Sequence, residues 1–131
     1  MSTLQSENHG ESQAQVFDPA RLALLMEMEE EGDTSMVKDI AVQFVEDVTG
    51  VMRKIEAAIA AGSFAQVAGP AHTIKGGAAT FGLFQVEKIA RELESCAKDA
   101  MKHNCIPAIY ESLRAAFAKG REALENYFNG K

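Results

Sequence analysis

Residues 34–61 read TSMVKDIAVQFVEDVTGVMRKIEAAIAA, and this stretch decides the fold of the chain. Apolar residues recur in it mostly at steps of three and four: Val37, Ile40, Ala41, Phe44, Val48, Val51, Met52, Ile55 and Ile59. This spacing predicts one continuous apolar stripe along a helix, and it excludes the alternation of a strand. Because so long a helix gains most of its stability from neighbours packed along its stripe, the stretch indicates a helical bundle.

The sequence before this stretch predicts a tail and a short helix. Residues 1–16 contain almost no large apolar side chains, so we expect them to form a disordered N-terminal tail. Asp18 is a good N-cap, and Pro19 fits the first position of a helix. We expect this helix to run to about Glu31 and to end at Gly32.

The sequence after it predicts three more amphipathic helices joined by short connections. Ser63, with Gln66 three residues on, has the pattern of a capping box that opens a helix, and Gly82 would end that helix as a left-handed residue. Two further apolar stripes follow, between Leu83 and Ala97 and between Ile106 and Phe128. We therefore predict an all-α fold for residues 17–129: an up-and-down antiparallel four-helix bundle with a short additional N-terminal helix.

Composition limits the classes of partner. The chain has 131 residues, of which 47% are hydrophobic, and its formal net charge is −6. The length suits one domain, and the acidic balance argues against nucleic acid, whose phosphates select basic surfaces. No apolar run approaches the roughly 20 residues that cross a bilayer, and the start does not resemble a signal peptide. We expect a cytoplasmic monomer with no membrane or nucleic-acid partner.

The stretch AHTIKGGAATFG, residues 71–82, carries the candidate functional site. Ala71 and Ile74 lie on the predicted buried line of their helix, so His72 lies beside that line. Two adjacent glycines in a helix interior each destabilise the helix by about 1 kcal/mol relative to alanine. Their presence therefore suggests a role other than helix formation. The neighbours of His72 at three and four residues, with one position a turn further on, form a patch of mostly small residues around the imidazole: Ala68, Gly69, Lys75, Gly76 and Ala79.

Such a patch lets another macromolecule approach an exposed imidazole that is mostly neutral and therefore nucleophilic near pH 7. If a ring nitrogen takes a phosphoryl group, Lys75 would stabilise its anionic oxygens. In an antiparallel bundle Arg91 and Glu94 lie at the same height as His72. Glu94 could accept a hydrogen bond from Nδ1–H, which would leave Nε2 free to attack.

These residues resemble the signature of histidine-containing phosphotransfer (HPt) domains: a histidine, a lysine three on, a glycine four on and a glycine ten on. The signature is matched by His72, Lys75, Gly76 and Gly82. The sequence of this stretch most resembles the phosphotransfer domain of chemotaxis-type histidine kinases. In that subgroup a glutamate of the next helix assists the histidine, and the matching position is Glu94. One departure is Pro70, where the family usually continues an unbroken helix.

The resemblance implies a phosphorelay protein that has no kinase activity of its own. His72 would accept a phosphoryl group from a receiver-domain aspartate or a histidine kinase and pass it to another receiver aspartate. The Mg²⁺ would be held by the receiver domain, and this chain would bind no cofactor. Two alternatives remain: a helical module that docks on receiver domains without phosphorylation, and a fragment of a larger kinase.

A metal site at Cys96, His103 and Cys105 is a weaker hypothesis. Three candidate ligands without a fourth, and with no tightly spaced pair, do not match the usual zinc patterns. We expect two free thiols near a loop, and no metal bound by this chain.

Overall fold

The structure is a computed structural model that describes residues 17–27 and 35–129. Every element in these two ranges is helical: α2 (Pro19–Met26), α3 (Ser35–Ala60), the 3-10 helix η1 (Phe64–Val67), α4 (Ala68–Thr80), α5 (Phe84–Ala97), the 3-10 helix η2 (Ala100–Cys105) and α6 (Ile106–Asn129). The predicted all-α class is confirmed. The expected tail, residues 1–16, lies outside the described residues, as does Gly32.

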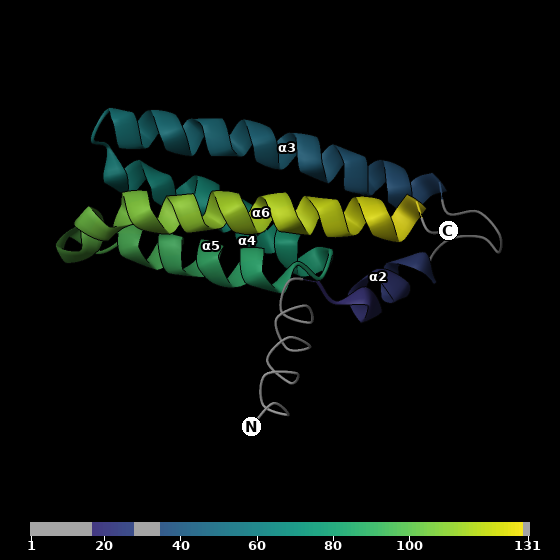
Figure 1. The fold of residues 1–131 in the computed structure, drawn as a ribbon. Helices are drawn as coiled ribbons and strands as arrows, with labels where there is room; N and C mark the ends of the chain where they lie inside the picture. The colour runs from purple at the N-terminus through teal and green to yellow at the C-terminus, as the bar shows by residue number, and fades with distance from the viewer. Residues whose placement is uncertain (1–16, 28–34, 130–131) are drawn as a thin grey trace, which may run out of the picture.

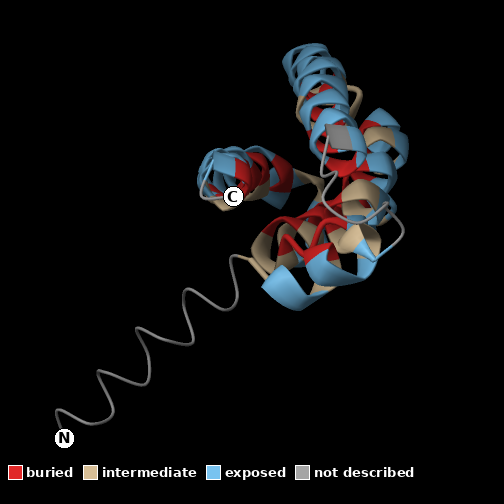
Figure 2. Cartoon of the chain, turned by 90° about the vertical axis from the view of Figure 1, so that its right-hand side faces the viewer, coloured by how far each residue is buried: buried red, intermediate tan, exposed pale blue. Residues whose placement is uncertain are grey.

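The long helices lie side by side and α2 lies at one end of them (Figure 1). Helix α4 packs against α3 and α5, and α6 packs against the same two helices. Buried residues gather on the faces that the helices turn toward one another (Figure 2). None of the described helices is long and apolar enough to cross a membrane.

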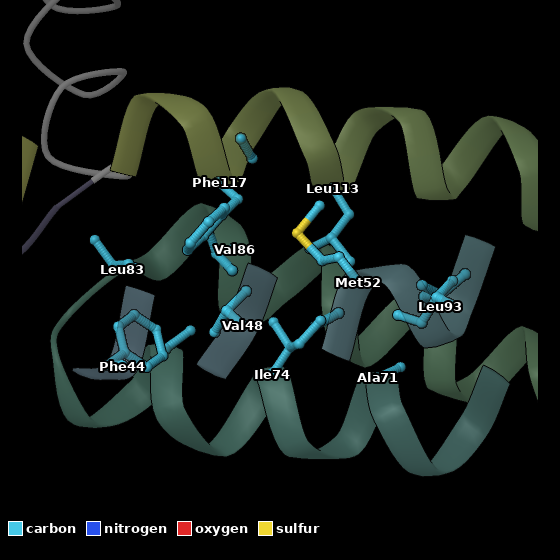
Figure 3. Packing of buried hydrophobic residues seen from close by; sticks show 14 of the residues in the cluster. Phe44, Val48, Met52, Ala71, Ile74, Leu83, Val86, Leu93, Leu113 and Phe117 are labelled. Atoms are coloured by element: carbon cyan, nitrogen blue, oxygen red, sulfur yellow. The ribbon is translucent and has the colours of Figure 1, made fainter. Parts of the chain in front are cut away.

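The stripe of α3 enters the core much as its spacing predicts. Phe44, Val48 and Met52 point toward Ile74 of α4 and Phe117 of α6 (Figure 3). The remaining stripe residues in the core are Val37, Ala41 and Ile55, joined by Ala58, which the prediction omitted. Val51 and Ile59 are half-buried at its edges.

Ile40 is a correction to that stripe. Its residue surface is 50% exposed, while the next residue, Ala41, is buried. Neighbouring residues of a helix point about 100° apart, so Ala41 takes the inward place and Ile40 faces outward. The buried face of α3 is therefore narrower than the stripe of apolar residues in its sequence.

The expected start of the histidine helix is also corrected. Ser63 makes no capping hydrogen bond through its side chain, so the predicted capping box does not form. A turn of 3-10 helix follows instead, and α4 begins afresh at Ala68. Pro70 is the third residue of α4, where its missing N–H would have had no partner within the helix. The helix therefore accommodates Pro70 without losing a hydrogen bond.

Helix α2 begins as predicted and ends early. The Asp18 side chain accepts a hydrogen bond from the Ala20 N–H at 3.0 Å, and Pro19 is the first helical residue. The helix ends at Met26, with Glu27 as its cap, rather than near Glu31. Residues 28–34, which include the predicted end near Glu31, lie outside the described residues.

The turn between α4 and α5 is closed by Gly82, as predicted. Its φ of +74° is the left-handed conformation that favours glycine. Gly82 N–H donates to the Ala79 carbonyl at 3.3 Å, and Leu83 N–H donates to the Ala78 carbonyl at 2.9 Å. This Schellman arrangement satisfies the last carbonyls of α4 and turns the chain back as α5.

Candidate functional site

His72 stands on the outer surface of α4. Its side chain is 65% exposed, whereas Ala71 and Ile74 on the same helix are fully buried. Because the buried residues fix which face of α4 is turned inward, the imidazole is held facing solvent. An exposed ring of this kind can act as a nucleophile toward a group that another molecule presents.

The small residues around His72 divide into two kinds. A Cβ added at Gly69 or at Gly76 would meet no atom within 4 Å, so both lie on open surface. Ala68 is half-buried and packs against the core. Ala79 is also half-buried, and its carbonyl accepts a hydrogen bond from Arg21 Nη1 at 2.7 Å. The open ground beside the imidazole is thus made chiefly by the two glycines, with the alanines at its edge.

The second glycine of the adjacent pair has a different cause. A Cβ on Gly77 would lie 2.5 Å from Cε1 of Phe44, so the Phe44 ring of α3 occupies the space that a side chain would need. Gly76 therefore belongs to the surface around His72, and Gly77 lies against Phe44 of the core. The two adjacent glycines therefore have separate reasons, one on each side of the helix.

Glu94 of α5 brings the predicted site residues together. Its Oε2 lies 3.0 Å from His72 Nδ1, and its Oε1 accepts a hydrogen bond from Lys75 Nζ at 2.8 Å. The Glu94 side chain is only 10% exposed and Lys75 is 26% exposed. Lys75 thus contacts the carboxylate rather than extending freely toward solvent beside the imidazole.

The Glu94 carboxyl is ionised throughout the ordinary pH range. The hydrogen bond from Lys75 is the main cause that lowers the pKa of Glu94 from 4.5 to about 2, against the opposing effect of burial. An ionised carboxylate can only accept hydrogen bonds, so a neutral His72 ring must carry its proton on Nδ1 to bond with it. Nε2 is then left with a free lone pair.

Lys98 is a member of this cluster that sequence reasoning missed. Its Nζ lies 3.2 Å from Glu94 Oε2, the oxygen that also faces His72. The signal was present, because Lys98 follows Glu94 by four residues on one helix. Arg91, which was expected at the same height, pairs instead with Glu87 at 3.0 Å.

The weaker metal hypothesis gains no support from the geometry. Among residues 17–27 and 35–129, no three metal-ligating side chains gather into a possible site. The His103 Nε2 atom is 2.9 Å from the Ala97 carbonyl, so that nitrogen is used in a backbone hydrogen bond. Cys96 is buried and Cys105 is exposed, and both are free thiols.

A hollow between two helices of the described part of the chain lies elsewhere. It has a volume of about 810 Å³ and is lined by residues of α3 and α6, including Val45, Arg53 and Leu124. His72 is not part of it. The histidine site is an open surface, which suits a macromolecular partner better than an enclosed small molecule.

The comparisons with known proteins show the family of this chain. The sequence model of the Hpt domain family matches residues 39–127, and the chain therefore belongs to that family. Among solved structures, the chain is similar to histidine-containing phosphotransfer protein B (HptB) from Pseudomonas aeruginosa PAO1. The TM-score is 0.77 at 26% sequence identity, over 90% of this chain and 98% of the other. No curated protein matches the sequence.

Proposed function

We propose that this protein carries phosphoryl groups in a two-component phosphorelay, with Nε2 of His72 as the acceptor atom. The observation that carries the proposal is the pairing of an exposed imidazole with a buried, ionised carboxylate at its Nδ1. A carboxylate in this position fixes the tautomer whose outward nitrogen is nucleophilic. Membership of the Hpt domain family and the similarity to HptB support the same role.

The transfer step balances without an added base. The Nε2 lone pair of His72 attacks the phosphorus of an aspartyl phosphate, a P–N bond forms, and the bond to the aspartate oxygen breaks with its electron pair. The proton stays on Nδ1, so the phosphorylated ring becomes cationic, and Glu94 stabilises that charge through its hydrogen bond. Lys75 contacts Glu94, and its ammonium can also stabilise the negative charge on the phosphoryl oxygens.

The partners in this proposal are response-regulator receiver domains or a histidine kinase, which approach over Gly69 and Gly76. We place the required Mg²⁺ on the receiver domain rather than on this chain. Glu94, the carboxylate beside the acceptor, is already in contact with three nitrogen atoms, and the charges of Lys75 and Lys98 would repel a metal ion. The protein would then be a carrier without kinase activity, acting in the cytoplasm as a monomer.

We also propose that the bundle is of the up-and-down antiparallel four-helix type, with α2 as the additional N-terminal helix. The contacts of α4 and α6 with both α3 and α5 support that arrangement. In it, a short turn after α4 returns α5 along α4 and sets Glu94 opposite His72.

Replacing the acceptor tests the function directly. We expect the wild-type chain to take up labelled phosphate from a phosphorylated receiver domain as an acid-labile, base-stable adduct, and His72→Gln to take up none. Because the His72 side chain is 65% exposed and glutamine retains an N–H donor for Glu94, the variant should melt close to the wild-type temperature. Thr73→Ala, a change at the exposed neighbouring residue, is the matched control and should label normally.

Two results would contradict the proposal. Labelling that persists in His72→Gln would place the phosphoryl group on another residue. A wild-type chain that binds receiver domains as tightly as His72→Ala does, and is labelled by none of them, would instead favour the docking module.

A further inference from the structure

Lys98 lies at the end of α5, and its side chain returns toward the acceptor site. Its Nζ is 3.2 Å from Glu94 Oε2, and His72 Nδ1 is 3.0 Å from the same oxygen. Lys75 holds the other oxygen, Oε1, at 2.8 Å. The carboxylate is thus contacted from three sides, with one ammonium on each oxygen.

We propose that Lys98 is a positioning residue for the phosphoryl acceptor. Together with Lys75 it clamps the Glu94 carboxylate, so that Oε2 stays directed at Nδ1 and the His72 ring keeps its Nε2 free. This inference rests on the proposed function of His72, which it deepens by assigning a role to a residue outside the family signature matched above.

A clamp of two ammonium groups is needed because one would leave the carboxylate free to turn. A carboxyl group held through Oε1 alone can rotate about its side-chain torsion, which is broad for glutamate. Rotation would move Oε2 away from Nδ1 and release the ring to exchange tautomers. The second contact, at Oε2, restricts that rotation.

The two lysines also place positive charge against Glu94. The ammonium groups of Lys75 and Lys98 each contact one carboxylate oxygen, while Glu94 remains a hydrogen-bond acceptor for Nδ1. The titratable and charged groups that face the His72 ring in this cluster are these three.

Lys98 could instead serve only to stabilise α5. It is the C-cap residue of that helix, where a cation interacts favourably with the helix dipole. Such a role would change the melting temperature and leave the imidazole tautomer as it is. The tautomer therefore separates the two explanations.

The experiment uses ¹⁵N NMR of the imidazole ring in the unphosphorylated full chain at pH 8. We expect wild type to carry its proton on Nδ1, and Lys98→Met to show a mixture of the two tautomers. Lys98→Arg keeps the charge and should restore the wild-type spectrum. Arg91→Met is the matched control, because Arg91 is a cation of α5 with similar exposure whose partner is Glu87.

The rate of phosphoryl uptake supplies the second measurement. Lys98 is 66% exposed, so its contact is partly screened, and its loss should slow uptake by about 2- to 5-fold. Arg91→Met should take up phosphate at the wild-type rate.

An unchanged tautomer in Lys98→Met would overturn the clamp, whatever happens to the melting temperature. The same slowing in Arg91→Met would also overturn it, because the effect would then be one of general surface charge. If wild type takes up no phosphate at all, the proposed function fails, and the NMR spectra still decide whether Lys98 positions the ring.

Discussion

At the scale of single residues, Glu94 organises the acceptor site. It is the one charged residue in the buried set of the described chain, at 7% exposure. A buried carboxylate is costly unless it is paired and hydrogen-bonded, and here His72, Lys75 and Lys98 contact it. The same contacts that make its burial tolerable also direct it at the imidazole.

This environment predicts a pH dependence of stability. The pKa of Glu94 is about 2 in the folded chain against 4.5 for the free group, chiefly because Lys75 donates to it. A lowered pKa stabilises the fold above pH 4.5, and that contribution is lost as pH falls from 4.5 to about 2. The shift corresponds to on the order of 3 kcal/mol. Urea unfolding across this range should show the loss in wild type.

Glu94→Gln should lack most of that dependence, since an amide does not titrate. Glu111→Gln is the matched control, because Glu111 pairs with Arg114 on the surface and its side chain is 62% exposed. In Glu111→Gln the free energy of unfolding should fall with pH as steeply as in wild type. If it falls equally steeply in wild type and in Glu94→Gln, the acid sensitivity arises from other carboxyl groups.

At the scale of elements, two adjacent glycines of α4 face two different environments. Gly76 lies under open space beside His72, and Gly77 lies against Phe44 of α3. The Phe44 ring stacks on Phe81 with centroids 4.7 Å apart, so it has little freedom to retreat. One glycine therefore keeps the site accessible, and the other leaves room for the Phe44 ring of α3.

The two glycines should respond oppositely to alanine. Gly76→Ala should raise the free energy of unfolding by about 0.5–1 kcal/mol, because alanine favours helix and meets nothing. Gly77→Ala should lower it by about 1–2 kcal/mol, because Phe44 must shift in a packed core. Urea unfolding of both variants measures the difference. A stabilised Gly77→Ala would mean that α3 and α4 separate at little cost.

At the scale of the whole molecule, α2 fixes the turn that sets α5 against α4. Asp18 N–H donates to the Gly82 carbonyl at 2.7 Å, and Arg21 Nη1 donates to the Ala79 carbonyl at 2.7 Å. Leu22 of α2 is fully buried, and Phe17 contacts Tyr127 of α6. This short helix thus covers the end of the bundle from which α5 starts toward Glu94.

Gly82 is the residue on which that attachment depends. A Cβ at Gly82 would lie 2.6 Å from the Asp18 carbonyl oxygen, in addition to requiring a positive φ. We expect Gly82→Ala to cost more than about 2 kcal/mol of stability and to increase hydrogen exchange in α2. Calorimetry and hydrogen exchange measure the two effects.

Gly62→Ala is the matched control for this variant. Gly62 has a φ of +72°, but a Cβ there would meet no atom within 4 Å. Gly62→Ala should therefore lower the stability by about 1 kcal/mol, because of the left-handed conformation alone. Hydrogen exchange in α2 should not change. Equal losses in the two variants would mean that the contact with α2 contributes nothing.

Much of this fold could be predicted from spacing alone. The apolar stripes of α3 to α6, the N-cap at Asp18 and the left-handed Gly82 are local features. They follow from the geometry of one helix or one turn. The position of His72 beside the buried line, with Lys75 and Gly76 one turn on, follows in the same way.

The errors arose where packing between elements overrides a local pattern. Ile40 fits the periodicity of α3 and still faces outward, because Ala41 occupies the inward place. Ser63 and Gln66 have the spacing of a capping box, but the chain there forms a 3-10 turn. The sequence does not record how closely two helices approach, so the reason for Gly77 could not be read from it.

The sequence by itself therefore determined the helices, the family and the histidine that faces solvent, because these depend on residues a few positions apart. Only the tertiary structure decided that Lys75 and Lys98 both contact Glu94, and that Glu94 in turn contacts His72. Those contacts join α4 to α5, and their existence depends on the packing of two helices and on side-chain torsions. Neither is encoded in the spacing of residues along one helix.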